Sequence, residues 1–416
     1  MFTAFLNKIS SLYKSLSLLR SRFLAIKKGH NSGGLLVDLQ RKVNNKKKVN
    51  EREDRLNREF IYISGAAALI IMSHKPTEAR TSLWQLVLRC IQSLLGPKIR
   101  LENVGMTLSL GNKSIAEGSY SNILIGIDVN SLKKYAVKKM LIQSKEAESN
   151  IKNEVEAFNR FHHKNIIPYI GHTYQLKNNM RIIYMVFPLI QRGNLRQQLN
   201  NFIERKSKRL DLLYVLKSIK AITEALSILH NYHPSYVHND IKPENILISD
   251  DGQPLLTDFG SVRLADLYVS NRSDSIRIAE ESSQFCTPQY RPPELYDPPM
   301  SIQLDHRTDV WGIGCLLFAW YYGYAPFELT YNKAGQTIAT ECTYLRILSG
   351  SISYPTPLTE PDHTLKALVA YILVHDISNR PSTSQVLDKL EETINRLQHV
   401  YYDPVRGEDT SISLHV

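Results

Sequence analysis

Residues that could transfer a phosphoryl group lie within positions 238–260, HNDIKPENILISDDGQPLLTDFG. Asp240 could accept the proton of an attacking hydroxyl, and Lys242 could place a positive charge beside the moving phosphate. Asn245 and Asp258 carry oxygen atoms, the ligands that Mg²⁺ prefers. A lone Asp-x-Lys also occurs in surface turns. Four such residues, followed by Phe259 and Gly260, instead favour a catalytic and metal-binding segment.

A second chemical signal lies upstream. Residues 115–123, IAEGSYSNI, resemble a degenerate glycine-rich loop, in which small side chains let backbone N–H groups approach phosphates. Ala116, Gly118 and Ser121 occupy the three small positions. This signal is weak alone, but Lys138 in YAVK lies 22 residues beyond Ala116, where a strand would carry its ammonium group to the phosphates.

A helical pattern follows at residues 147–162, with apolar Val155 and Phe158 on one face. Glu154 lies on this predicted helix and is the expected ion-pair partner of Lys138. The alternative for Glu154 is an ordinary exposed carboxylate, and Glu156 competes for the same role. We favour Glu154, because Glu156 does not have the expected spacing to the following HHKNII segment.

Together these segments resemble a eukaryotic protein kinase over about residues 110–398. DVWGIGC at 309–315 resembles the helix beneath the kinase catalytic loop. RPPE ends at Glu294, where the family has Ala-Pro-Glu, and the resemblance implies a structural bidentate ion pair between Glu294 and Arg380. Lys242 and the CTPQY sequence before RPPE resemble serine/threonine kinases rather than tyrosine kinases.

A narrower resemblance can be stated. GQPLLTDFGSV, FPLIQRGNL and DHRTDVWGIGCLLFAWYYGYAPFE resemble the Numb-associated kinase group, in particular its small myristoylated and palmitoylated serine/threonine kinase. That group folds an extra helix within the activation segment, which here spans residues 258–294. The resemblance therefore implies a helix at about residues 275–283, in a segment that would otherwise be taken for a disordered loop.

The resemblance implies an α+β fold with two lobes, a small β-rich N-lobe and a larger α-helical C-lobe, in a kinase domain at residues 105–400. It also implies ATP and Mg²⁺ as cofactors and serine or threonine hydroxyls of proteins as substrates. Thr287 would contact Asp240 and Lys242, Asn245 and Asp258 would hold the metal, and Phe187 would be the gatekeeper. The nucleotide-binding set implied is Ala116, Gly118, Ser121, Ile123, Ala136, Lys138, Glu154, Phe187, Leu189, Asn245 and Asp258.

Apolar patterns predict the elements that position these residues. We expect short strands within 105–140, a strand at 181–191 that runs into the hinge between the lobes, and a long core helix at 212–232. A final helix is expected at 384–400, followed by a polar tail at 401–416.

One departure from the kinase pattern bears on regulation. Asn239 replaces the arginine that usually precedes the catalytic aspartate and binds a phosphorylated activation loop. We therefore expect activity that does not depend on phosphorylation of that loop. The same departure, with Ala116 and Ser121 at glycine positions, leaves a pseudokinase scaffold as an alternative function. Residues 1–95 leave a second alternative, a membrane-tethered adaptor.

Composition separates the extension at residues 1–104 from the rest of the chain. Residues 1–75 hold fifteen Lys and Arg against five Asp and Glu, whereas the whole chain of 416 residues has a net charge of +11. The basic charge thus lies in the extension. Four scattered cysteines lack disulfide or metal-ligand spacing, which favours a reducing cytoplasmic location.

The extension has several possible roles. Residues 1–28 contain no acid and show helical apolar periodicity, as do interfacial membrane helices and mitochondrial transit peptides, and sequence does not separate the two. A solvated tail, an anionic Golgi or other endomembrane surface bound through residues 1–95, and initiation at Met72 all remain open. Nucleic acid is disfavoured because no aromatic platform accompanies the charges. The 60–72 block is too short for a helix that crosses a bilayer.

Lipid anchors receive little support from the sequence. The myristoylated glycine of the resembling kinase corresponds here to Phe2, and Ser73 follows Met72, so that anchor does not transfer. Cys90 lies on a predicted amphipathic helix at 83–96, where either palmitoylation or an ordinary packed thiol is possible.

Overall fold

The computed structural model describes residues 97–117, 121–204, 210–331 and 336–401, all within one compact unit. The expected helices at 1–28 and 83–96, the apolar block at 60–72 and residues 402–416 lie outside the described residues. In the part of the chain that is described, no helix combines the length and apolarity needed to span a membrane.

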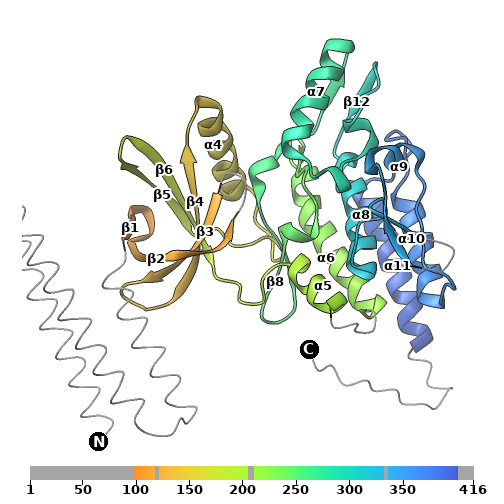
Figure 1. The fold of residues 1–416 in the computed structure, drawn as a ribbon, viewed down its shortest axis with the longest axis horizontal. Coiled ribbons are helices and arrows are strands. Elements are labelled where there is room, and N and C mark those ends of the chain that lie inside the picture. The colour runs from red at the N-terminus through yellow and green to blue at the C-terminus, as the bar shows by residue number, and fades with distance from the viewer. Residues whose placement is uncertain (1–96, 118–120, 205–209, 332–335, 402–416) are drawn as a thin grey trace, which may run out of the picture. The chain divides into compact units, whose positions relative to one another are not determined.

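A six-stranded antiparallel sheet forms the small lobe (Figure 1), with the strand order β1-β2-β3-β4-β6-β5. The strands are β1 (Lys98–Leu101), β2 (Met106–Glu117), β3 (Ser121–Asp128), β4 (Lys134–Ile142), β5 (Gly171–Lys177) and β6 (Met180–Pro188). The strands expected within 105–140 and toward the hinge are present. β1 and the short 3-10 helix η1 (Glu102–Val104) precede the boundary predicted at residue 105, yet β1 pairs with β2 in this sheet.

The helix α4 (Lys145–Arg160) is the helix of the small lobe, close to the predicted range 147–162. Ser144 caps its N-terminus, because its side chain accepts a hydrogen bond from the backbone N–H of Ala147. Its apolar face includes the buried Val155 and Phe158. Glu154 is also buried on this helix, which places a carboxylate in the interior of the small lobe.

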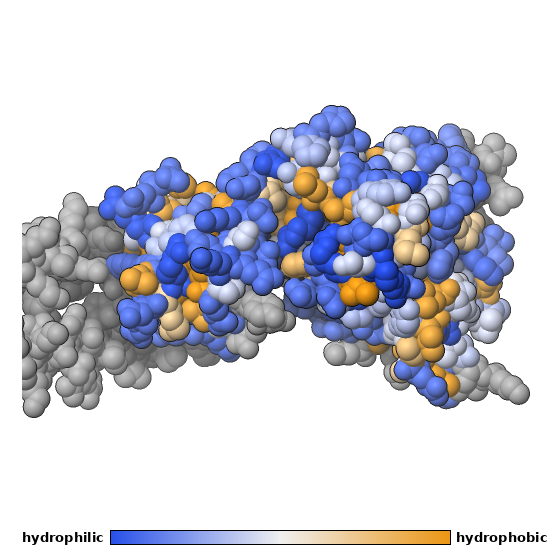
Figure 2. All heavy atoms as spheres, turned by 90° about the horizontal axis from the view of Figure 1, so that it is seen from above, coloured by the Kyte–Doolittle hydropathy of each residue, from blue (hydrophilic) through white to orange (hydrophobic). Residues whose placement is uncertain are grey.

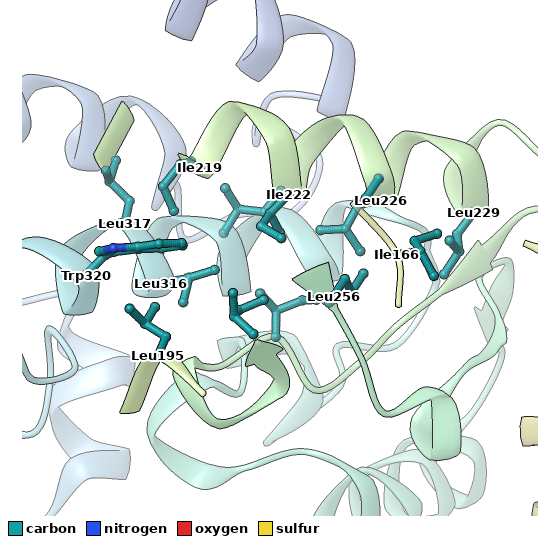
Figure 3. Close-up of a cluster of buried hydrophobic side chains, with 14 of the residues drawn as sticks. Ile166, Leu195, Ile219, Ile222, Leu226, Leu229, Leu256, Leu316, Leu317 and Trp320 are labelled. Carbon is teal, nitrogen blue, oxygen red and sulfur yellow. The ribbon is translucent and has the colours of Figure 1, made fainter. Parts of the chain in front are cut away.

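Helices form most of the large lobe. They are α5 (Leu195–Glu204), α6 (Leu212–His230), α8 (Arg307–Tyr322), α9 (Thr343–Ser349), α10 (Glu360–Ile372) and α11 (Thr383–Tyr401). α6 and α11 match the predicted helices at 212–232 and 384–400 within about two residues. In Figure 3, α6 runs along one side of an apolar core, with Leu226 above Leu256 and Ile219 beside Leu317 of α8. Burial of this area is the main stabilising force of the lobe.

α8 is the central helix, buried from Thr308 to Tyr321. Cys315 lies inside it, fully buried, as the apolar pattern around it indicates. The exterior of the domain is different: the face in Figure 2 is mainly hydrophilic, with hydrophobic side chains in smaller groups.

Short strands and 3-10 helices carry the loops of the large lobe. The strands pair as β7 (Tyr236–Val237) with β10 (Arg263–Leu264), β8 (Ile246–Ile248) with β9 (Pro254–Leu256), β11 (Leu267–Val269) with β12 (Ile302–Leu304), and β13 (Leu329–Tyr331) with β14 (Thr337–Ala339). The 3-10 helices are η2 (Pro243–Asn245), η3 (Phe259–Ser261), η4 (Pro288–Tyr290) and η5 (Pro293–Leu295).

The activation segment contains α7 (Arg272–Phe285), so the helix expected at about 275–283 is confirmed. Asn271 caps it by accepting a hydrogen bond from the backbone N–H of Asp274. The segment ends at Glu294, where Glu294 and Arg380 form the expected bidentate pair with N···O distances of 2.7 and 2.8 Å. This buried pair fixes the end of the activation segment to the core of the large lobe.

Candidate active site

The catalytic loop follows β7 and is held by a buried carboxylate of α8. Asp309 accepts hydrogen bonds from the backbone N–H of His238 at 2.6 Å and of Asn239 at 2.8 Å, and from Nε2 of His230 at 3.0 Å. Burial by itself would raise the pKa of Asp309, but the His230 hydrogen bond and the other donors lower it. Asn239 has φ of 66°, a left-handed conformation that asparagine tolerates better than most residues.

Asp240, Lys242 and Thr287 form one compact set of polar contacts. The Thr287 hydroxyl donates to Asp240 Oδ1 at 2.7 Å, and Lys242 Nζ donates to the same hydroxyl oxygen at 2.7 Å. Lys242 Nζ also lies 2.7 Å from Asp240 Oδ2. The expected contacts of Thr287 are therefore present, and the pair Asp240 and Lys242 holds an alcohol oxygen between an acceptor and a cation.

Asn245 and Asp258 come together because β8 and β9 form a hairpin. Ile246 pairs with Leu256, so the next residues outward, Asn245 and Thr257, are also neighbours, and the Thr257 N–H donates to the Asn245 carbonyl at 3.0 Å. Asn245 Nδ2 donates to the Asp240 carboxylate at 3.0 Å. This fixes the amide orientation and leaves Asn245 Oδ1 as the atom suited to a metal ion.

Lys138 is positioned between two carboxylates. Its Nζ lies 2.7 Å from Glu154 Oε1 and 2.8 Å from Asp258 Oδ1, and its side chain is only 13% exposed. Burial by itself would lower the pKa of Lys138, but the two carboxylates raise it above its ordinary value. The Lys138 ammonium lowers the pKa of Asp258 to about 2, whereas burial raises that of Glu154.

The ion pair decides between the two candidate glutamates. Glu154 is 3% exposed and contacts Lys138, whereas Glu156 lies exposed on α4. This confirms Glu154 as the partner. The physical reason is the helical period, since residues 154 and 156 point to different faces of one helix.

The expected nucleotide-binding residues that belong to β2, β3, β4 and β6 share one face of the sheet. Ile123 pairs with both Ala116 and Lys138, and Phe187 pairs with Ala136, two residues before Lys138. Direct cross-strand partners and alternate residues of a strand lie on the same face.

Two further members of that set lie at the ends of these strands. Ser121 begins β3, and Leu189 follows β6 in the connection to the large lobe. Phe187 is buried against Phe158, with ring centroids 5.0 Å apart. Gly118 lies outside the described residues.

One contact that couples α4 to the site was not predicted from the sequence. Phe259 stacks on Phe158 of α4, with ring centroids 4.5 Å apart and an interplanar angle of 5°. His238 meets the edge of Phe259 at 5.4 Å. The sequence contained both signals, an apolar helix position and an aromatic after Asp258, but nothing local indicated that they touch.

Comparison with known proteins agrees with this site. Residues 111–390 match the model of the protein kinase domain. The chain is 28% identical to serine/threonine-protein kinase 16 of Rattus norvegicus, over 67% of this chain and 88% of the relative. The human protein of the same name is 27% identical over the same shares, and serine/threonine-protein kinase ppk13 of Schizosaccharomyces pombe is 26% identical over 68% and 90%.

The chain therefore belongs to the protein kinase family. The similar proteins place it among the serine/threonine kinases.

Proposed function

We propose that this protein transfers the γ-phosphoryl group of ATP to serine or threonine hydroxyls of proteins. The observation that carries the proposal is the Thr287 hydroxyl, which lies 2.7 Å from Asp240 Oδ1 and 2.7 Å from Lys242 Nζ. A substrate alcohol in an equivalent position would find an acceptor for its proton and a cation for the phosphoryl charge. Because the transition state is loose, this positioning contributes more than basicity.

The residues present fit a magnesium nucleotide. The Asn245 amide oxygen and the Asp258 carboxylate are hard oxygen donors, and the Asp258 side chain is 45% exposed and able to reach a ligand. Within the described ranges, no cluster of three or more His, Cys, Asp or Glu side chains is built to hold a metal by itself. Mg²⁺ usually takes one or two protein ligands and completes its shell with phosphates and water. Bound there, it would neutralise charge on the phosphates.

Lys138 would bind the α- and β-phosphates, with Glu154 fixing its direction. Ile123, Ala136 and Phe187 share the face of Lys138, and with Leu189 they would contact the adenine. The gatekeeper role of Phe187 is consistent with its burial at the end of β6.

A finer assignment rests on the activation segment. We infer that the chain is related to the Numb-associated kinase group, because α7 lies where that group folds an extra helix. Lipid attachment is not part of this inference.

The test is phosphorylation of a generic protein substrate by the full chain with ATP and Mg²⁺. Asp240→Asn should abolish transfer, while Asp251→Asn, an acid in the β8–β9 turn, should not. Thermal unfolding establishes that each variant is folded. A folded protein that binds ATP but phosphorylates neither itself nor a substrate would contradict the proposal and support the pseudokinase alternative.

We further propose that the basic extension directs the kinase to an anionic cytoplasmic membrane surface, such as that of the Golgi. Excess Lys and Arg gain about 1 kcal/mol each near such a surface. The measurement is co-sedimentation with phosphatidylserine vesicles, with phosphatidylcholine vesicles as control. Changing Lys46, Lys47 and Lys48 to Glu should reduce binding, and unchanged binding would contradict a charge-driven contact.

A further inference from the structure

Arg263 joins three segments that lie far apart in the sequence. Its Nη2 donates to Asn150 Oδ1 of α4 at 3.0 Å. Its Nη1 donates to the carbonyls of Gly260 at 3.0 Å and Val262 at 2.8 Å, both just after Asp258. Its guanidinium lies over the ring of Phe285, the last residue of α7, at 4.2 Å from the centroid. We propose that Arg263 is a positioning residue that holds α4 in its active place without a phosphate in the activation segment.

The position of α4 controls the site through Glu154. Asn150 lies one helical turn before Glu154, so both are on the same side of α4. A bond that fixes Asn150 therefore limits the rotation of the helix that carries the partner of Lys138. The inference thus rests on the proposed function, since positioning matters only if Lys138 binds a nucleotide.

The stacking of Phe158 on Phe259 couples α4 to the segment after Asp258, but packing between α4 and α7 is incomplete. A cavity of about 450 Å³ lies between α4 and the activation segment, lined by Asn153, Ala157 and Arg160 on one side and by Leu267, Ile278 and Phe285 on the other. Where two elements enclose a cavity, fewer dispersion contacts hold them together. The hydrogen bonds of Arg263, at the edge of this cavity, therefore contribute more to the position of α4.

Neutral groups already hold Arg263, so no anion is needed to direct it. The three hydrogen-bond acceptors of Arg263 are neutral oxygens that already direct the guanidinium. Asn239, at the place of the usual arginine, is neutral and donates to the Ser261 carbonyl at 3.1 Å. Ser261 in turn donates to the Phe285 carbonyl at 3.0 Å, which anchors the end of α7. Direct hydrogen bonds thus join segments that a phosphate would otherwise bridge.

The experiment uses the full chain and a double-mutant cycle. The variants are Arg263→Met, Asn150→Ala and both together, with Asn150→Asp as the conservative change that keeps the acceptor oxygen. Arg277→Met is the matched control, because Arg277 is an exposed arginine of α7. The readouts are kcat/KM, hydrogen exchange of residues 145–160, thermal stability, and activity of the wild type after phosphatase treatment.

We expect Arg263→Met and Asn150→Ala each to lower kcat/KM about tenfold, the usual effect of losing a hydrogen bond to a charged group. The double variant should be no worse than Arg263→Met, because both remove the same contact. Exchange of α4 should rise in all three, while Asn150→Asp and Arg277→Met should behave like the wild type. Phosphatase-treated wild type should keep its activity.

Additive losses in the double variant would overturn the proposal, as would unchanged exchange of α4 or loss of wild-type activity after phosphatase treatment. Wild-type protein that transfers no phosphate would instead refute the proposed function. In that case the exchange data still decide whether Arg263 holds α4, so the two failures are distinguishable.

Discussion

Removing Arg380 tests how the activation segment is anchored. Arg380 is 2% exposed and its partner Glu294 is 5% exposed, with N···O distances of 2.7 and 2.8 Å. Arg380 also donates to the carbonyls of Val374 at 2.9 Å and Arg307 at 2.9 Å. Arg380→Met keeps much of the volume but leaves a buried, unpaired carboxylate. Breaking a buried pair in this way costs about 3–5 kcal/mol.

That cost converts to a shift in melting temperature. At about 2 °C per kcal/mol, the lower value for large domains, the Tm of Arg380→Met should fall by about 6–10 °C. The assay is thermal unfolding followed by circular dichroism at constant pH and salt. Arg396→Met, an exposed arginine of α11, is the matched control and should change Tm by less than about 2 °C.

The double variant Glu294→Leu/Arg380→Met separates the ion pair from its packing. Replacing a whole buried pair by apolar side chains is often neutral, so much of the lost Tm should return. A fall in Arg380→Met no larger than that of Arg396→Met would refute the reasoning, because the Glu294 carboxylate would then not need its partner.

Three further predictions concern the site. Lys138→Met should lower kcat about a hundredfold or more, because it removes a preorganised donor from the phosphates. Lys139→Met, on the opposite face of β4, should leave kcat unchanged. Steady-state kinetics with ATP measures both. Thr287→Ala should lower kcat/KM about tenfold, because it removes the hydroxyl that donates to Asp240 and keeps only the backbone N–H that donates to Asp240 at 3.2 Å. Thr287→Ser keeps both donors and should retain activity. Equal losses in the two variants would contradict the role of the hydroxyl. The folded-state pKa of Asp258 is lowered from 3.8 to about 2, so its stabilising contribution is present above pH 3.8 and is lost as pH falls through about 2. The free energy of unfolding of Asp258→Asn should therefore lack this part of the pH dependence, as denaturant titrations from pH 5 downward would reveal.

The spacing of residues within short segments was enough to predict which side chains carry the chemistry. The spacing of Asp240, Lys242, Asn245 and Asp258 is set by one turn and one hairpin, which short segments determine by themselves. The spacing to the HHKNII segment favoured Glu154 over Glu156, and helical periodicity gives the physical reason for the outcome, because it fixes which side chains share a face. The helix α7 was anticipated from the family resemblance, since its own composition indicated only a polar loop.

Tertiary structure decided how distant segments meet. Nothing near Arg263 in the sequence indicates Asn150, 113 residues away, because such a contact depends on how α4 and the activation segment pack. The same holds for the stacking of Phe158 on Phe259 and for β1, whose place in the sheet comes from its pairing with β2. The chain specified the reacting groups through short-range geometry. Their alignment is a property of the packed core, where hydrogen bonds and apolar burial between remote residues fix one arrangement.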